Sequence, residues 1–171
     1  MLKDRILKVW KNYITSQFLL MMSVFGLTWL AGALTGLRFA FINAMFSGVC
    51  ELIPNFGPLI SGAVSVILAL AFGSSILDLA NWQFALIILA ICVVIQLLQN
   101  WLINPLVVGK KMDLNPILIF LGSLAFTAVF GFWGMVLAVP IMATFKEALK
   151  YSQEKKLQNS DQVEKLPKPK E

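Results

Sequence analysis

The sequence predicts an all-α polytopic integral membrane protein. Of its 171 residues 58% are hydrophobic, the mean hydropathy is +0.80, and the apolar residues form long runs rather than an amphipathic pattern. Nearly all charges lie in the first 11 residues, in the Lys110-Lys111 pair and after Phe145. The net charge of +5 therefore belongs to segments that flank a lipid bilayer, and we expect no nucleic-acid partner.

The cysteine and histidine content limits which metal sites and catalytic sites the chain could form. Cys50 and Cys92 both fall in predicted apolar helices, where a thiol behaves as a small hydrophobe, and the chain has no histidine. Without a histidine imidazole, these thiols have no partner for a zinc site. A catalytic triad of the usual kind is excluded for the same reason. The sequence also lacks a Gly-rich phosphate loop. We therefore expect no disulfide, no metal, no cofactor and no enzymatic activity.

Residues 1–16 are predicted to form an interfacial amphipathic helix, with basic side chains toward the cytoplasmic leaflet. The alternative is a solvated start of the first span. The apolar face of this helix holds Leu2, Ile6, Val9 and Tyr13, and the opposite face holds Asp4, Lys8, Lys11 and Thr15. A cleaved signal peptide ending near Ala31-Gly32-Ala33 is disfavoured, because the following chain is just as hydrophobic.

Two kinds of apolar segment follow within a transmembrane domain of residues 17–151. Residues 17–36 are uncharged and long enough, at about 1.5 Å per residue, to cross a hydrocarbon core of about 30 Å. Residues 38–53 and 58–73 each give only about 24 Å of helix. We predict that these two form a re-entrant hairpin that enters and returns on one side, with two short full crossings as the alternative.

The segment Cys50-Glu51-Leu52-Ile53-Pro54-Asn55-Phe56-Gly57-Pro58 breaks this hairpin. Pro58 has no N–H for a helix, and the ring of Pro54 crowds the carbonyl one turn back. Lipid cannot satisfy the backbone groups that such a break frees, so the break must be buried in protein or line a watery cavity. We therefore expect a polar site here.

The second half of the chain repeats this outline. Residues 84–103 form a second long span, which Lys110-Lys111 places with its end in the cytoplasm. Residues 116–131 and 133–149 form a second hairpin, broken at Gly131-Phe132-Trp133-Gly134. A long span followed by a broken hairpin thus occurs twice, and the two units enter the membrane from opposite faces. This arrangement predicts an inverted repeat, in which the two helix breaks, or elbows, converge on a solute pathway.

The loops and ends complete the topology. Residues 73–83 carry no Lys or Arg and are predicted to lie outside, whereas both termini are predicted to be cytoplasmic. Residues 152–171 are rich in Lys, Glu, Gln and Pro with hardly any apolar residue. We expect them to form a disordered, charged tail.

Glu51 is the one acidic residue inside an apolar segment, and ionising it at mid-depth costs several kcal/mol unless a partner or water is present. It is predicted to be a proton or cation site, with a position near the interface or pairing with Arg38 as the alternatives. Gln96, Gln99 and Asn100 form a polar stripe that serves either helix packing or a solute. The candidate solute- or ion-binding residues are Glu51, Pro54, Asn55, Gly57, Pro58, Gln99, Asn100, Asn104, Gly131 and Gly134.

Four motifs together resemble the autoinducer-2 exporter (AI-2E) family, over nearly the whole chain up to about Tyr151. They match only the C-terminal half of a family member, so we expect an N-terminal half to be missing here. The motifs run from Ile53 to Pro58, from Asn100 to Gly109, across Asn115-Pro116, and from Phe130 to Met135 and on through Ala138-Val139-Pro140.

The resemblance implies an oligomeric bacterial inner-membrane transporter that exports the quorum-sensing signal, with sodium/proton antiport described for some members. Asn55 stands where the family usually has an aromatic residue, and Asn115 where it commonly has histidine. Without that imidazole, proton coupling would fall on Glu51. The expected function is transport of a small polar solute by a homo-oligomer in the lipid bilayer. The alternatives are a sodium/proton antiporter and a non-transporting scaffold or truncated half-transporter.

Overall fold

The computed structural model describes residues 2–53, 56–107 and 116–164, with side chains up to residue 155. Three stretches are long and apolar enough to cross a membrane, namely Leu2–Thr35, Asn81–Val107 and Ile117–Lys155. This confirms the predicted all-α membrane fold. In chain order the helices are α1 (Leu2–Thr35), α2 (Ala40–Cys50), α3 (Phe56–Phe72), α4 (Asn81–Leu98), the π-helix η1 (Gln99–Ile103), α5 (Asn104–Val107) and α6 (Pro116–Glu164).

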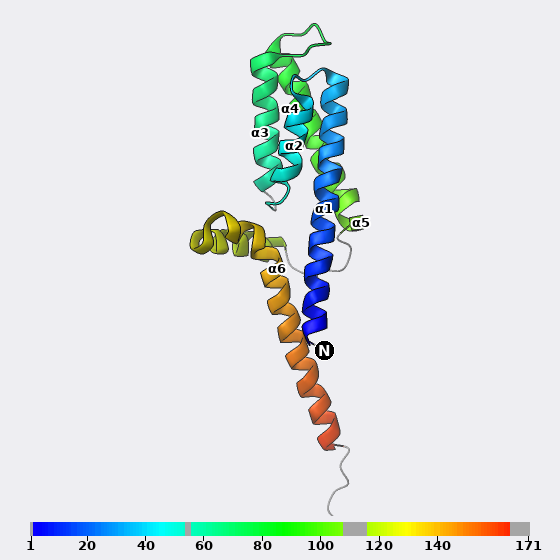
Figure 1. Ribbon diagram of the computed structural model, residues 1–171, viewed down its shortest axis with the longest axis vertical. Helices are drawn as coiled ribbons and strands as arrows, with labels where there is room; N and C mark the ends of the chain where they lie inside the picture. The colour runs from blue at the N-terminus through cyan, green and yellow to red at the C-terminus, as the bar shows by residue number, and fades with distance from the viewer. Residues whose placement is uncertain (1, 54–55, 108–115, 165–171) are drawn as a thin grey trace, which may run out of the picture.

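Helices α1 to α4 run side by side, and the α1–α2 and α3–α4 connections meet at the same end of the molecule (Figure 1). Two hydrogen bonds join these connections: the Ser75 amide donates to the Gly36 carbonyl at 2.8 Å, and the Ser74 hydroxyl donates to the Thr35 carbonyl at 2.7 Å. Both open ends of the α2–α3 pair therefore lie together, so the two short helices form a hairpin, whereas its re-entrant character stays a prediction. The core between these helices is formed by Leu37, Ala69, Phe84, Ala85 and Ile88.

The second long span extends beyond its predicted end. Helix α4 continues through η1 into α5, so one apolar rod runs from Asn81 to Val107 and contains Pro105. The ring of a proline crowds the carbonyl four residues earlier, which here belongs to Trp101. The chain accommodates this by widening to π-helical hydrogen bonds just before Pro105, where the Asn104 amide donates to the Gln99 carbonyl.

The second predicted hairpin lies within α6. Gly131 has φ 59° and ψ −143°, a backbone conformation that side-chain-bearing residues avoid, and it divides α6 into two helices that fold back on each other (Figure 1). Close packing follows on both sides of the turn. A Cβ at Gly134 would overlap the Phe126 carbonyl, and one at Gly122 would overlap the Met142 side chain. The predicted helix break at Gly131 is thus confirmed.

Pro140 frees a carbonyl in α6 that α1 satisfies. A proline at position 140 cannot donate to the carbonyl of Val136, one turn earlier. The Tyr13 hydroxyl donates to that carbonyl at 3.0 Å, and Tyr13 is only 8% exposed. One turn before Tyr13, the Trp10 indole N–H donates to the Thr144 hydroxyl at 3.1 Å. Helix α1 therefore holds α6 at the residues around its proline.

The interfacial position of residues 1–16 stays a prediction, and the helix boundaries fit its alternative, a start of the first span. Residues 1–16 are expected from the sequence to form an element apart from the span 17–36, but Leu2–Thr35 is one continuous helix. Tyr13, on the face expected to meet lipid, contacts α6 instead. The Arg5 guanidinium lies 2.8 Å from the Glu154 carboxyl and 3.4 Å from that of Glu147. Tyr13 on the same helix is buried against α6 because it satisfies the freed carbonyl.

The predicted disordered tail is also corrected over most of its length. Residues 152–164 continue α6 as helix, whereas residues 165–171 lie outside the described part. No proline or glycine interrupts residues 141–164, so the helix has no local reason to stop. Glu154 in this segment also pairs with Arg5. The polar composition of the tail therefore does not prevent residues 152–164 from continuing the helix.

Replacing Tyr13 by phenylalanine is expected to lower the free energy of unfolding by about 2 kcal/mol, because the Val136 carbonyl loses its partner inside the protein. In a Pro140→Ala background the loss should fall by at least about half, since the introduced alanine would supply a backbone N–H to the Val136 carbonyl. Reversible unfolding in mixed micelles measures this double-mutant cycle. Tyr151→Phe is the control. Equal losses in both backgrounds would refute the link between Pro140 and Tyr13.

The inverted repeat stays a prediction. Both halves of the chain contain a long helix followed by a broken pair, as expected. The two pairs pack differently, however: α2 and α3 lie along α1 and α4, while the start of α6 projects sideways from α1 (Figure 1). The resemblance between the halves therefore lies in their helix lengths and breaks.

Candidate functional site

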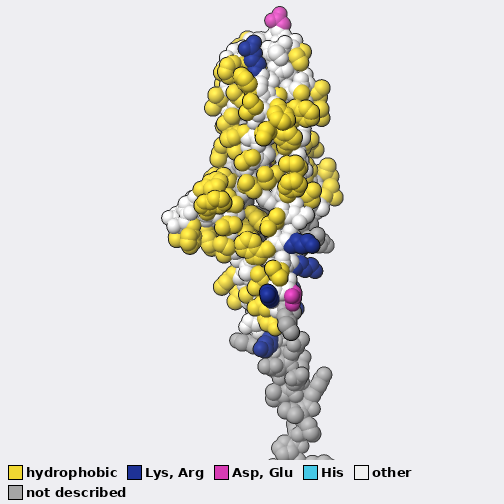
Figure 2. All heavy atoms as spheres, in the orientation of Figure 1, with side chains coloured by type: hydrophobic (Ala, Val, Ile, Leu, Met, Phe, Trp, Pro, Cys, Tyr) yellow, Lys and Arg dark blue, Asp and Glu magenta, His cyan; other side chains and the backbone are white. Residues whose placement is uncertain are grey.

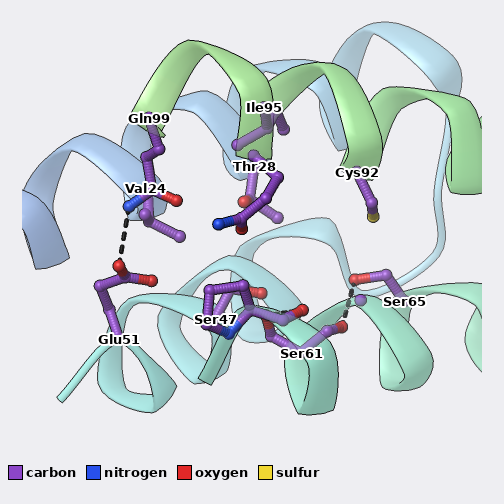
Figure 3. Close-up of a pocket in the computed structure, with 12 residues that line it drawn as sticks. Val24, Thr28, Ser47, Glu51, Ser61, Ser65, Cys92, Ile95 and Gln99 are labelled. Atoms are coloured by element: carbon purple, nitrogen blue, oxygen red, sulfur yellow. Dashed lines mark hydrogen bonds between the residues drawn. The ribbon is translucent and has the colours of Figure 1, made fainter. Parts of the chain in front are cut away.

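The candidate site centres on Glu51, which directly follows the last residue of α2. Glu51 Oε1 accepts a hydrogen bond of 2.9 Å from Gln99 Nε2 (Figure 3). Its second oxygen, Oε2, is buried and has no hydrogen-bond partner among the described residues. A buried carboxyl oxygen without a donor is costly, so this atom is available to a ligand or water that brings one.

The π-helix places Gln99 opposite Glu51. In a π-helix the hydrogen bonds join residues five apart instead of four. The residues that follow are therefore shifted around the helix by one position relative to a regular α-helix. Gln99 is only 2% exposed, whereas its neighbour Trp101 is 82% exposed. The amide of Gln99 is thus buried between helices, although it belongs to an otherwise apolar helix. The widening near Pro105 therefore positions the partner of Glu51.

Helix α1 donates hydrogen bonds to the ends of two other helices at the same level. Gln17 Nε2 donates to the backbone carbonyl of Glu51, at the end of α2. The Ser16 hydroxyl donates to the Val107 carbonyl, at the end of α5, at 3.2 Å. These carbonyls have no intrahelical donor because their helices stop. Helix α1 therefore fixes the positions of both chain segments that carry the Glu51–Gln99 pair.

A small polar cavity lies beside this pair. Its volume is about 30 Å³, enough for a water molecule. In Figure 3 its labelled side chains point into one space between α1 and α4 on one side and the α2–α3 hairpin on the other. No group of three His, Cys, Asp or Glu that could hold a metal occurs among the described residues. The cavity is lined by Val24, Thr28, Ser47, Glu51, Pro58, Ser61, Gly62, Ser65, Cys92, Ile95, Gln96 and Gln99.

Polar contacts continue from this cavity along the α2–α3 hairpin. Asn43 Nδ2 donates to the Ser65 hydroxyl at 2.9 Å, and both residues are 3% exposed. Ser47, one turn from Asn43, and Ser61, one turn from Ser65, are also buried. Hydroxyls in apolar helices can return their hydrogen bonds to the carbonyl one turn back, and Ser47 and Ser65 do so. A buried polar column therefore leads from Glu51 toward Asn43.

The predicted site residues separate into three groups. Glu51, Pro58 and Gln99 line the cavity. Gly57 does not line the cavity but precedes Pro58 in the first turn of α3, where a Cβ would overlap the Cys50 carbonyl. Pro54 and Asn55, like Asn115 and the segment with Lys110, Lys111 and Asp113, lie outside the described residues.

The remaining predicted residues do not line this cavity. Asn100 is exposed, and its Oδ1 accepts a hydrogen bond of 3.3 Å from Asn104 Nδ2, one turn away. Gly131 and Gly134 belong to the hairpin in α6, and neither borders the cavity. Glycines at these two positions serve the turn and its close packing.

The predicted convergence of the two elbows is not observed in the described residues. A Cβ at Gly131 would meet nothing within 4 Å, and the flanking Phe130, Phe132 and Trp133 are 56–68% exposed. The start of α6 instead approaches the break of the first hairpin, where the rings of Phe120 and Phe56 stack with their centroids 5.8 Å apart. The tip is aromatic, and none of its residues lines the cavity beside Glu51.

Sequence reasoning missed several cavity residues. It places Gln17 only at the start of the first span, and Ser47, Ser61 and Ser65 as ordinary members of apolar helices. The spacing carried a signal: Ser47 lies one turn before Glu51, and Ser61 and Ser65 are one turn apart. Such spacing places the hydroxyls on one face, but only the packing shows that this face meets α4.

Comparisons with known proteins agree on one family. The family model of AI-2E family transporters matches residues 2–154. YrrI of Bacillus subtilis (strain 168) is 27% identical over 135 residues, 79% of this chain and 36% of YrrI. TqsA of Escherichia coli (strain K12), named as an AI-2 transport protein, is 26% identical over 121 residues, 71% of this chain and 33% of TqsA. PerM of the same strain, whose name contains the word permease, is 30% identical over 150 residues, 83% of this chain and 40% of PerM.

The chain spans about a third to two fifths of the length of these curated relatives. The family match nevertheless includes every element around the cavity, from α1 to the part of α6 that carries Glu154. The Glu51–Gln99 pair and the contacts of α1 therefore lie within the matched region.

Proposed function

Because this chain belongs to the AI-2E transporter family, we propose that it forms part of a membrane transport pathway in which a small polar solute passes Glu51 and Gln99. The observation that carries this proposal is the free Oε2 atom of Glu51, buried beside a polar cavity inside apolar helices. A hydroxyl of the solute would supply the donor that this oxygen lacks.

Autoinducer-2 is the candidate solute, since TqsA is named for its transport. The cavity of about 30 Å³ is far smaller than a typical small-molecule site of about 300 Å³ or more. Passage therefore requires the α2–α3 hairpin to separate from α4. The relatives compared above are not named for sodium/proton exchange, so an antiporter is the less favoured candidate.

We also propose a bacterial inner-membrane location with both ends of the chain in the cytoplasm. Apolar side chains cover the upper part of the face shown in Figure 2, and basic side chains gather toward its lower end. Helix α1 starts near this end and α6 leads past it (Figure 1), so Lys3, Arg5, Lys146 and Lys150 would meet the same leaflet.

A homo-oligomer completes the proposal. In the three candidate spans only 11–28% of the most apolar window is buried inside one chain. Faces of this extent can pack against further copies in the bilayer. Native mass spectrometry from lipid discs would measure the number of copies, and a strictly monomeric species would contradict this part of the proposal.

The test of the proposed function is solute uptake into liposomes that contain the purified chain. Glu51→Gln is expected to reduce autoinducer-2 uptake by about 100-fold, because the solute loses a hydrogen bond to the carboxyl group. The control is Asp78→Asn, the same chemical change at an exposed residue of the α3–α4 connection. Unchanged uptake by Glu51→Gln would refute the site. A wild-type chain that moves no solute but binds a full-length relative would instead indicate a scaffold.

A further inference from the structure

A second, larger cavity lies on the other side of the Glu51 site, between α3 and α4. Its volume is about 610 Å³, and it opens to the outside of the bundle. Its lining is apolar apart from Gln96. Leu59, Ile67 and Val93 in this lining are 72%, 61% and 51% exposed. In a membrane this groove faces lipid chains, and we refer to it below as the α3–α4 groove.

The α3–α4 groove and the polar cavity share one wall. Pro58, Gly62, Cys92 and Gln96 line both of them. The wall is thin because three of these residues have short side chains, and a Cβ at Gly62 would have only the Cys92 Cβ, 3.9 Å away, as its near neighbour. The fourth, Gln96, makes no side-chain hydrogen bond to a described residue, so its amide is available from the groove.

Two polar groups thus lie at the inner end of an apolar groove. The Gln96 amide borders the groove itself, and the Glu51 Oε2 atom lies in the cavity behind the shared wall. Both groups can accept hydrogen bonds, and the Glu51 carboxyl repels anionic or acceptor-only groups. A ligand that fits must therefore combine an apolar chain with a head that donates hydrogen bonds.

We propose that the α3–α4 groove binds a single-chain amphiphile, whose apolar chain lies along Leu59 and Val93 and whose hydrogen-bond-donating head reaches Gln96 and the Glu51 cavity. The ligand enters from the lipid and is distinct from the solute of the proposed function. This inference therefore goes beyond that function. A head with N–H donors satisfies the two acceptors, while its apolar chain stays among the apolar side chains of the groove.

Alkylation of Cys92 reports on the shared wall directly. Cys92 is partly exposed and lines both cavities, whereas Cys50 is 8% exposed and lines neither. Peptide mass spectrometry separates the two thiols, so the native chain is used without substitution. The purified protein in lipid nanodiscs is treated with N-ethylmaleimide, with and without dodecylamine. At saturation dodecylamine should slow Cys92 alkylation by about tenfold and leave Cys50 unchanged.

The matched probe is dodecyltrimethylammonium, which has the same chain and charge but no N–H donor. It is expected to protect Cys92 by less than about twofold. Equal protection by both amphiphiles would overturn the assigned head-group chemistry, and protection by neither would overturn the site. A Cys92 that resists alkylation without amphiphile, yet reacts after unfolding, would show that another helix covers the groove and would also overturn the proposal.

Two variants locate the head group. Glu51→Gln and Gln96→Leu should each remove most of the protection by dodecylamine, while Asp78→Asn should retain it. Two variants at different residues guard against the failure of one to fold. The readout is thiol protection rather than uptake, so failure here leaves the solute pathway intact. Loss of uptake by Glu51→Gln with undiminished protection would support the solute pathway and overturn the placement of the head group at Glu51.

Discussion

Replacing Gly57 by alanine is expected to lower the free energy of unfolding by about 3 kcal/mol and to disrupt the Glu51 site. An added Cβ would overlap the backbone carbonyl of Cys50, which already accepts a hydrogen bond of 2.9 Å from the Ile53 amide. Backbone atoms cannot rotate away as a side-chain tip can. The chain must therefore open between α2 and α3, where Glu51 lies.

The control for this prediction is Gly62→Ala, five residues further along α3. Its Cβ would meet the Cys92 Cβ at 3.9 Å, an ordinary van der Waals distance. Gly62→Ala should stay within about 0.5 kcal/mol of the wild type or be slightly stabilising, since alanine favours helix. Reversible unfolding in mixed micelles compares the two. Equal stabilities of both variants would contradict the close approach of Gly57 to Cys50.

Replacing Gln99 by leucine should lower the free energy of unfolding by about 3 kcal/mol, because it leaves both oxygens of the Glu51 side chain without a protein donor. Leucine is close to glutamine in size, so packing alone should change little. Asn100→Leu, at the next residue, is the control: Asn100 is exposed, and the expected loss is below about 0.5 kcal/mol.

A second substitution separates the unpaired carboxyl from other causes. The double variant Gln99→Leu, Glu51→Leu removes both partners and should recover most of the lost stability, since an apolar pair leaves no buried group unsatisfied. If the double variant is as unstable as Gln99→Leu alone, the loss comes from packing or from the π-helix rather than from Glu51. Thermal unfolding in the same detergent measures all three chains.

Several elements were predictable because their causes are local. The two long spans, predicted at residues 17–36 and 84–103 and observed within Leu2–Thr35 and Asn81–Val107, follow from runs of apolar residues long enough to cross a bilayer. The break at Gly131 follows from a backbone conformation that needs glycine. Glu51 is identifiable because a single acidic residue in an apolar segment requires a partner, whatever that partner is. Each of these arguments uses only neighbours within a few turns of helix.

The errors share a different cause. Residues 1–16 are expected from their pattern to lie at the membrane surface, but Trp10 and Tyr13 donate hydrogen bonds to α6, more than 100 residues away in the sequence. The helical part of the tail extends α6 because nothing in it ends a helix, which its polar composition concealed. The two elbows are expected to meet, yet the Gly131 turn ends in exposed aromatic rings. In each case the structure depends on whether a segment distant in the sequence packs against the residues concerned.

The sequence by itself determined the fold class, the helix breaks and the family, because hydropathy, proline and glycine act along the chain. Only the tertiary structure decided which polar groups meet. The rotation of each helix about its axis places Gln99, Gln17 and Ser65 inside and Asn100 outside. That rotation depends on non-local packing and, at Gln99, on the π-helix next to Pro105. Residue spacing along one helix leaves this rotation undetermined.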